Sequence, residues 1–449
     1  MGNSLLSLAE AFGIRVGELV AMVGGGGKTS LMFGLAAVLP GGTVVTTTTR
    51  IFTAQMKLAP AVEVFSGGEG SEMALPLAEH PFVLVVGAVS GEKALGVSPG
   101  LPGSLLKRPD VDYVLVEADG SRMRPSKAPA DHEPVIPLEA TLVVPVVGID
   151  AVGRRVADVA HRPERVQALT GLDVDDVMTA EALGTLIAHP QGGRKNVPAG
   201  ARVIPLINKV ETAEQLAAAR LIARQALREP EIERVIVGAV QAKFPVVEVQ
   251  QRVTAVVLAA GESSRMGETK QLLAWGETTV LGQTLRNVRG SAVHDCLLVS
   301  GHKAEPVEAI ARDEGVAVVH NPDYAAGEML SSVQAAVRHL DEGCAAVLVM
   351  LADQPMVEPE TIDQILSAFW QGRSDLVAPV YQGQRGNPVS IGRRYFNELL
   401  ALPPGAAPRD LVKRHLYRLY LVEVGSDSIL RDLDRPEEYE RWRPEVGSG

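Results

Sequence analysis

The chain has 449 residues, of which 46% are hydrophobic and 22% are charged, and its formal net charge at pH 7 is −11. This composition is typical of a globular protein with two or three domains, and the excess of negative charge argues against nucleic acid as a partner. Two cysteines exclude a disulfide framework, and no apolar run reaches the ~18 residues of a membrane span. We therefore expect a cytoplasmic protein without a membrane partner.

Short apolar runs alternate with helical stretches along the whole chain, which predicts an α/β fold with mainly parallel sheets. In the first half, the expected strands are 19–23, 43–47, 82–88, 113–117, 141–147, 203–207 and 235–240, and the segment 211–229 is expected to be an amphipathic helix. In the second half, the expected strands are 253–259, 296–300, 317–320, 346–351, 376–380 and 419–424.

Each half begins with an apolar strand that runs directly into a glycine-containing turn, which is how nucleotide-binding α/β units usually begin. We therefore expect two Rossmann-like three-layer domains, 1–245 and 252–449, with the boundary near 243–252.

The first glycine turn reads LVAMVGGGGKTS, a strand followed by a loop and a helix. Such a loop can direct its N–H groups toward a phosphate, Lys28 can neutralise terminal phosphates, and Thr29 can bind Mg²⁺. Met22 replaces the first glycine of the strict P-loop pattern, so the segment fits a shorter G-x-x-G-K-T form, as in the Mur ligases. The predicted nucleotide-binding residues here are Gly24, Gly25, Gly26, Gly27, Lys28 and Thr29.

A second acidic element, VDYVLVEADGSR, is an apolar strand that ends in Glu117 and Asp119. Carboxylates at the carboxyl end of a strand are where open α/β sheets hold Mg²⁺, so Glu117 joins Thr29 as a candidate metal ligand. The segment INKVE at 207–211 has the first two residues of the N-K-x-D guanine-reading element, but Glu211 replaces the aspartate.

A family resemblance rests on five segments of the first half. They are VGGGGKTS, TTTTRIF at 46–52, EADGSRMRPSKAPADHEPVIP at 117–137, HRPE at 161–164 and INKVE. The chain resembles the YqeC-like proteins here, which are called selenium-dependent hydroxylase accessory proteins. The resemblance implies a role in the maturation of a client molybdenum hydroxylase. The glycine loop makes ATP or GTP a candidate ligand of this P-loop-like domain. In the Pro-rich loop beyond the acidic strand, Lys127, Asp131, His132 and Glu133 are candidates for closing over a ligand.

The segment TAVVLAAGESSRMGETKQ opens the second half with a strand, a loop of small residues and two cations. Small residues let the backbone approach a nucleotide, and Arg265 and Lys270 can stabilise the charge of a leaving pyrophosphate. The predicted nucleotide-binding residues of this loop are Leu258, Ala259, Ala260 and Gly261.

This string resembles the small nucleotidyltransferases of the molybdenum-cofactor class, whose fold is that of nucleotide-diphospho-sugar transferases. Further matching segments are NPDYAAGEMLSS at 321–332, VLVMLADQPMV at 347–357 and RDLDRPEEY at 431–439. The resemblance implies that Ser332 lies near the nucleotide and that Asp353, with Asp434, holds Mg²⁺. Arg265, Lys270 and Asp353 are then the catalytic residues.

Within that family an LAAG opening implies cytidylyl transfer, so the resemblance predicts transfer of CMP from CTP to molybdopterin or Mo-molybdopterin with release of pyrophosphate. The extra methyl group of Ala260 is expected to disfavour a purine. Two alternatives stay open at this point: another small nucleotidyltransferase, which transfers a guanylyl group or acts on a sugar phosphate, and a chaperone that mainly loads cofactor into the client enzyme.

Overall fold

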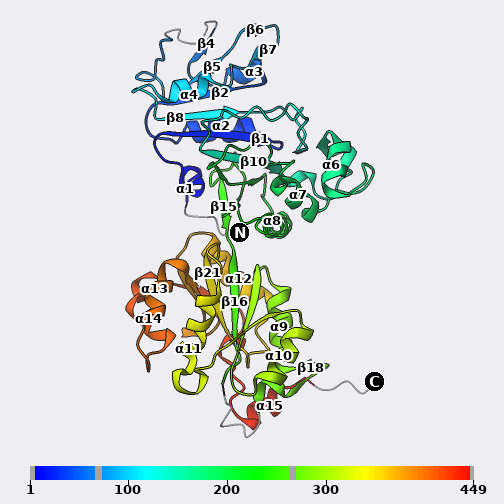
Figure 1. Cartoon of the computed structure of the whole chain (residues 1–449), viewed down its shortest axis with the longest axis vertical. Helices are drawn as coiled ribbons and strands as arrows, with labels where there is room; N and C mark the ends of the chain where they lie inside the picture. Colours follow the sequence, from blue (N-terminus) through cyan, green and yellow to red (C-terminus); the bar gives the residue numbers. More distant parts are fainter. Residues whose placement is uncertain (1–5, 66–72, 262–268, 445–449) are drawn as a thin grey trace. The chain divides into compact units, whose positions relative to one another are not determined.

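The computed structural model describes residues 6–65, 73–261 and 269–444, which form two compact units, Met1–Gln250 and Gln251–Gly449 (Figure 1). Each unit is a largely parallel sheet with helices on both faces. This confirms the predicted fold class of two three-layer α/β domains. Within the described ranges, every helix is too short or too polar to cross a membrane.

The described part of the first unit contains a ten-stranded sheet with the order β15-β14-β13-β10-β1-β8-β2-β5-β4, in which β12 also pairs with β10. Its strands are β1 (Glu18–Gly24), β2 (Thr43–Thr47), β4 (Val62–Val64), β5 (Phe82–Val86), β8 (Tyr113–Glu117), β10 (Leu142–Gly148), β12 (Arg202–Val203), β13 (Leu206–Asn208), β14 (Val235–Gly238) and β15 (Val246–Gln250). Met22 of β1 lies opposite Glu117 of β8 and Val144 of β10, so the glycine loop and the acidic strand end at the same edge.

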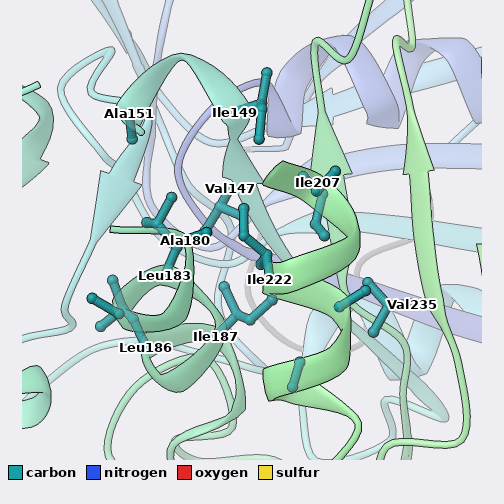
Figure 2. Close-up of a cluster of buried hydrophobic side chains, with 14 of the residues drawn as sticks. Val147, Ile149, Ala151, Ala180, Leu183, Leu186, Ile187, Ile207, Ile222 and Val235 are labelled. Carbon is teal, nitrogen blue, oxygen red and sulfur yellow. The ribbon is translucent and has the colours of Figure 1, made fainter. Parts of the chain in front are cut away.

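Helices cover both faces of this sheet because successive side chains of the buried strands point to opposite sides. Val20 and Met22 pack with α1 and α2, whereas Leu19 and Ala21 pack on the face that carries α4. Figure 2 shows the core that α7 and α8 form with Val147 of the sheet. The helices of this unit are α1 (Leu8–Phe12), α2 (Lys28–Ala36), α3 (Thr53–Met56), α4 (Leu101–Leu106), η1 (Ile149–Ala151), α5 (Val156–Val159), α6 (Pro163–Thr170), α7 (Ala180–Ala188) and α8 (Ala213–Ala226).

Two small sheets complete the described part of the first unit. Strands β3 (Arg50–Phe52), β6 (Val89–Ser90) and β7 (Lys93–Leu95) form one, and β9 (Ser126–Lys127) and β11 (Ala160–His161) form the other. The second brings the Pro-rich loop and the HRPE segment together, because Lys127 lies directly opposite His161.

The division between the two units, between Gln250 and Gln251, falls within the range 243–252, and most of this segment is a strand that was not predicted. Residues Val246–Gln250 form β15, which pairs antiparallel with β14 at the edge of the sheet. The strand is buried, and its Glu248 carboxylate is fully enclosed and bound by the Arg220 guanidinium of α8. The strand depends on these contacts with distant residues, so the sequence of the segment by itself did not predict it. The predicted strand 203–207 is also divided, into β12 and β13, around Pro205, which has no N–H group for a ladder.

The described part of the second unit contains an eight-stranded sheet with the order β20-β19-β16-β21-β24-β22-β23, in which β25 pairs with β22. Its strands are β16 (Val253–Leu258), β19 (Asp295–Ser300), β20 (Ala317–His320), β21 (Ala346–Leu351), β22 (Leu376–Tyr381), β23 (Gln384–Arg385), β24 (Val389–Gly392) and β25 (Leu419–Glu423). Strand β24 was not predicted, and it runs antiparallel between β21 and β22. A two-stranded hairpin is formed by β17 (Ala274–Trp275) and β18 (Thr278–Thr279).

Two cores lie on opposite faces of the second sheet. One joins it to α9, α10 and α12, and the other joins it to α11, α13 and α14. The helices of this unit are η2 (Lys270–Leu272), α9 (Val280–Gly290), α10 (Ala304–Asp313), α11 (Tyr324–His339), α12 (Pro359–Trp370), η3 (Arg393–Tyr395), α13 (Phe396–Leu400), α14 (Pro408–Arg414), η4 (Leu416–Arg418), η5 (Asp427–Leu430) and α15 (Pro436–Trp442).

Candidate functional site

The glycine loop after β1 has a backbone that only glycine adopts readily. Gly24, Gly26 and Gly27 have φ angles of 92°, 82° and 125°. A Cβ atom at Gly26 would lie 2.2 Å from the backbone nitrogen of Gly148, so a side chain there would displace β10. These glycines therefore allow the loop to lie directly on the neighbouring strand.

The N–H groups of this loop do not all point to one place, which differs from the expectation for a phosphate cradle. Gly24 donates to the Asp119 carboxylate at 3.1 Å, Gly25 donates to the carbonyl of Val146 at 2.9 Å, and Gly26 donates to that of Arg124 at 3.1 Å. The acceptors come from segments far away in sequence. The first turn of α2 still presents the N–H groups that a helix leaves without an intrahelical partner, and these are the donors suited to an anion.

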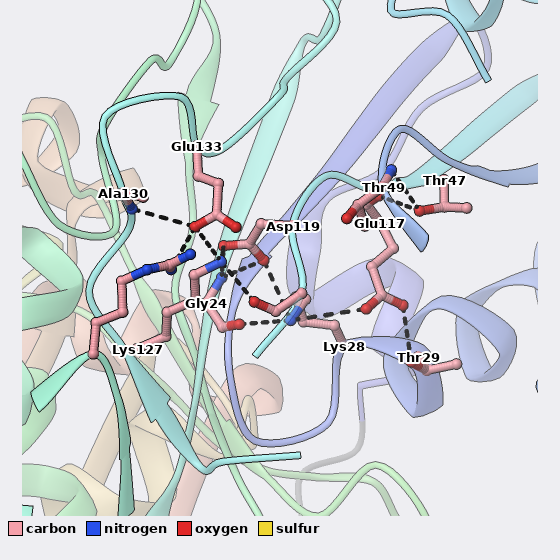
Figure 3. Close-up of polar contacts among 12 residues, drawn as sticks. Gly24, Lys28, Thr29, Thr47, Thr49, Glu117, Asp119, Lys127, Ala130 and Glu133 are labelled. Carbon is pink, nitrogen blue, oxygen red and sulfur yellow. Dashed lines mark hydrogen bonds and ion pairs between the residues drawn. The ribbon is translucent and has the colours of Figure 1, made fainter. Parts of the chain in front are cut away.

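Lys28, Thr29 and Glu117 lie together beside this loop, as Figure 3 shows. The buried Lys28 ammonium donates to the carbonyl of Gly24 at 2.5 Å and lies 3.3 Å from Asp119 and 3.8 Å from Glu117. The Thr29 hydroxyl donates to Glu117 at 2.8 Å. Burial raises the pKa of Glu117, although the Lys28 charge and the Thr29 hydrogen bond oppose it. A hydroxyl next to a carboxylate suits Mg²⁺, so these residues fit the predicted metal site.

A chain of ion pairs extends from Asp119 into the Pro-rich loop (Figure 3). The fully enclosed Lys127 ammonium lies 2.9 Å from Asp119 and 3.0 Å from Glu133, and Arg162 of the HRPE segment lies 2.6 Å from Glu133. Burial alone would raise the pKa of Glu133, but its hydrogen bonds with Lys127 and Arg162 lower the pKa to about 2. The Pro-rich loop is thus fastened to the glycine loop through Asp119.

Only part of the Pro-rich loop belongs to this network. Asp131 and His132 are exposed, and Asp131 pairs with Arg165 of α6. Asp119 itself occupies the centre of the network, with contacts to Gly24, Lys28 and Lys127. The sequence indicates Asp119 only as a neighbour of Glu117, because no motif shows that a carboxylate caps the glycine loop.

The second unit has a cavity of about 460 Å³ at the carboxyl ends of β16 and β21. Loop residues, the start of η2, helix α11 and two separate acidic segments line it. The lining residues are Leu258, Ala260, Gly261, Lys270, Gln271, Tyr324, Met329, Ser332, Leu351, Ala352, Asp353, Asp432 and Asp434. The predicted residues Lys270, Asp353, Asp434 and Ser332 therefore share one cavity.

Lys270 joins two of the acidic residues of this cavity. Its ammonium is hydrogen-bonded to the carboxylate of Asp353 and lies 2.8 Å from that of Asp434. Burial lowers the pKa of Lys270, but the two carboxylates outweigh this effect and raise the pKa overall. The lysine is therefore a permanent positive charge at the base of the cavity.

Asp432 is a third carboxylate in the cavity, and the sequence prediction missed it. Burial and the nearby Asp353 charge raise the pKa of Asp432 to about 6, while a hydrogen bond from Gln354 at 2.6 Å opposes them. The D-x-D spacing could have indicated it, because side chains two residues apart in an extended segment point to the same side.

The small-residue loop after β16 is divided between the cavity and the core. Leu258, Ala260 and Gly261 line the cavity, whereas Ala259 packs in the hydrophobic core beneath it. Three of the four predicted residues of this loop therefore line the cavity, and the side chain of Ala259 does not. A Cβ atom placed on Gly301 would lie 2.7 Å from that of Ala260, so the Ala260 methyl group rests against Gly301.

Ser332 is held by the N-P-x-Y segment. The buried Asn321 side chain donates to the Ser332 hydroxyl at 3.0 Å and to that of Ser331 at 2.8 Å. Arg265, the remaining predicted catalytic residue, lies outside the described residues.

The acidic residues of the cavity fit a hard divalent cation in donor chemistry. In the described ranges, no cluster of three or more His, Cys, Asp or Glu residues is arranged to hold a metal ion by itself. Mg²⁺ typically takes one or two carboxylates and completes its shell with water and substrate phosphates, which is what Asp353 and Asp434 can offer.

Two families match the chain. The YqeC protein family matches residues 20–164, and the MobA-like NTP transferase domain matches residues 255–419. Among known proteins, the chain is 34% identical to YqeC of Escherichia coli K12 over 50% of this chain and 88% of that protein.

Two further relatives also match the chain in sequence. The molybdenum cofactor cytidylyltransferase of Escherichia coli K12 is 31% identical over 41% of this chain and 92% of that protein. The nicotine blue oxidoreductase of Paenarthrobacter nicotinovorans is 29% identical over 42% of this chain and 95% of that protein. Together with the fold and the cavity, these likenesses show that the chain belongs to the YqeC family in its first unit and to the MobA-like nucleotidyltransferase family in its second.

Proposed function

We propose that the second unit transfers CMP from CTP to the phosphate of molybdopterin, or of Mo-molybdopterin, and releases pyrophosphate. An acceptor phosphate oxygen attacks the α-phosphorus of CTP, a new P–O bond forms, and the bond to the β-phosphate oxygen breaks. The observation that carries the proposal is the convergence of Lys270, Asp353 and Asp434 in one cavity beside the small-residue loop.

The residues of the cavity suit the charges of this reaction. Two anions must meet, so Lys270, and Arg265 as the family resemblance implies, would offset their repulsion and stabilise the departing pyrophosphate. Asp353 and Asp434 would hold Mg²⁺, which would help to neutralise the negative charge of the phosphates. Ser332, on α11, also lines the cavity and would contact the nucleotide.

The choice of CTP rests on the LAAG opening and on the named relative. The methyl group of Ala260 lines the cavity and is backed by Gly301, so it cannot retreat to make room for a larger base. One similar protein is named as an oxidoreductase, so the decisive experiment measures nucleotide transfer itself.

The test is release of pyrophosphate by the full chain with Mg²⁺, CTP and molybdopterin, compared with GTP, UTP and a sugar 1-phosphate. Asp353→Asn should lower the rate by roughly a hundredfold or more, because it removes a charge that holds the metal. Asp313→Asn, on the exposed end of α10, is the matched control. Preference for UTP with a sugar phosphate would replace this proposal with the first alternative, another small nucleotidyltransferase.

For the first unit, we propose nucleotide binding in support of the maturation of a molybdenum hydroxylase. The grouping of Lys28, Thr29 and Glu117 at the start of α2 supports an Mg²⁺–ATP or Mg²⁺–GTP site. The experiment is titration of the protein with each nucleotide, with and without Mg²⁺. If neither ATP nor GTP binds, the nucleotide site proposed for the first unit is wrong, whereas the proposal for the second unit still stands.

A further inference from the structure

The position between Asp353 and Asp434 already holds a cation, the ammonium group of Lys270. It contacts both carboxylates, and its side chain is largely shielded from solvent. These carboxylates come from distant parts of the chain, since Asp353 follows β21 and Asp434 precedes α15. Lys270 therefore acts as the bridge between two separate acidic segments.

An Mg²⁺ ion held by Asp353 and Asp434 would compete with this ammonium for the same carboxylate oxygens. Each charge-assisted hydrogen bond from Lys270 must be given up before those oxygens can bind a metal ion. The triphosphate of a nucleotide offers the lysine a replacement, because phosphate oxygens accept the same hydrogen bonds. Asp432 adds a third carboxylate to the cavity, so the local charge stays favourable for a cation once the lysine has turned away.

We propose that Lys270 keeps Asp353 and Asp434 closed to divalent cations in the free protein, and that it transfers to the phosphates when a nucleotide binds, so that metal and nucleotide are accepted together. This inference rests on the proposed function for the identity of the nucleotide. It assigns Lys270 a role before the chemical step, in addition to charge stabilisation during it.

The experiment is Mn²⁺ titration of the full chain without nucleotide, followed by electron paramagnetic resonance of the free ion. Lys270→Met keeps the aliphatic stem and removes the charge, and it should tighten Mn²⁺ binding at this site by roughly tenfold or more. Lys270→Arg keeps the charge and should bind like wild type. Lys413→Met, a loss of one exposed charge on α14, is the matched control.

A double variant shows where the tighter Mn²⁺ binding arises. Adding Asp353→Asn to Lys270→Met should abolish the tighter binding, whereas a gain that persists would place it elsewhere and overturn the inference. Equal affinity of wild type and Lys270→Met would overturn it as well. Lys270→Gln provides a second neutral variant should the methionine variant fail to fold.

Repeating the Mn²⁺ titrations with CTP distinguishes this inference from the proposed function. CTP should tighten Mn²⁺ binding more in wild type than in Lys270→Met, because the variant has no lysine to displace. If CTP has no effect on any variant, the assignment of CTP fails, while the titrations without nucleotide still decide the role of Lys270.

Discussion

The side chain of Asn208, at the end of β13, donates a 2.9 Å hydrogen bond to the carbonyl oxygen of Gly26 in the glycine loop. Its amide oxygen accepts a 3.0 Å hydrogen bond from the backbone of Val240. The buried amide thus fastens the loop to a strand that lies 182 residues away along the chain. It gives the INKVE segment a structural role that does not depend on reading a guanine base.

Asn208→Ala should therefore lower the free energy of unfolding by about 1–3 kcal/mol, because the buried Gly26 carbonyl and the partly buried Val240 N–H group lose their partner. It should also weaken nucleotide binding by the first unit, since the loop loses its support. Denaturant unfolding and nucleotide titration measure the two effects. Asn196→Ala removes a hydrogen bond from a partly buried asparagine in the same unit, and it should leave nucleotide binding unchanged.

Lys28→Met should weaken binding of ATP or GTP by at least about tenfold, because it removes the one charge of the loop that can contact terminal phosphates. The methionine retains most of the side-chain volume in this buried position. Isothermal titration calorimetry on the full chain is the measurement, and Lys57→Met, on the C-cap of α3, is the control. Unchanged affinity in Lys28→Met would show that the nucleotide does not use this loop.

Much of the fold could be predicted from the sequence because its central strands are continuous apolar runs. The bounds of β2, β8, β20 and β21 match the predicted ranges. Strands buried on both faces have this pattern whatever their neighbours are. Strands β15 and β24 were missed because they are antiparallel additions to parallel sheets, and pairing with a distant strand defines them.

For the candidate sites, the sequence could predict which residues lie close together. Lys28 with Glu117, and Lys270 with Asp353, follow from the rule that neighbouring parallel strands end at one edge. What could not be predicted is how these groups are paired. In both units a lysine near the first strand contacts two carboxylates, Asp119 and Glu117 in one case and Asp353 and Asp434 in the other. Such contacts depend on side-chain positions that no motif encodes.

Glu133 should make the stability of the first unit sensitive to acid. Its pKa falls from the ordinary 4.5 to about 2 in the folded protein, so the ionised carboxyl adds stability above pH 4.5. That contribution is lost as the pH falls from 4.5 to about 2, because the unfolded chain takes up the proton first. At pH 7, Glu133→Gln should unfold at a lower temperature than wild type, and this difference in Tm should shrink below pH 4.5. The exposed Glu139→Gln is the control, and a deficit that stays constant with pH would contradict the assignment.

Gly301 and Ala260 form a packing pair that should control the shape of the nucleotide cavity. In Gly301→Ala the added methyl group would lie 2.7 Å from the Cβ atoms of both Ala260 and Tyr324, closer than carbon atoms can approach. We expect this variant to lose about 1–3 kcal/mol of stability and to bind CTP more weakly, because the loop must shift toward the cavity. Ala260→Gly in the same protein removes one of the two clashes and should recover part of both losses, whereas Ala260→Gly alone should raise the affinity for GTP relative to CTP. Strict additivity of the two substitutions in a double-mutant cycle would show that the contact between them does not shape the cavity.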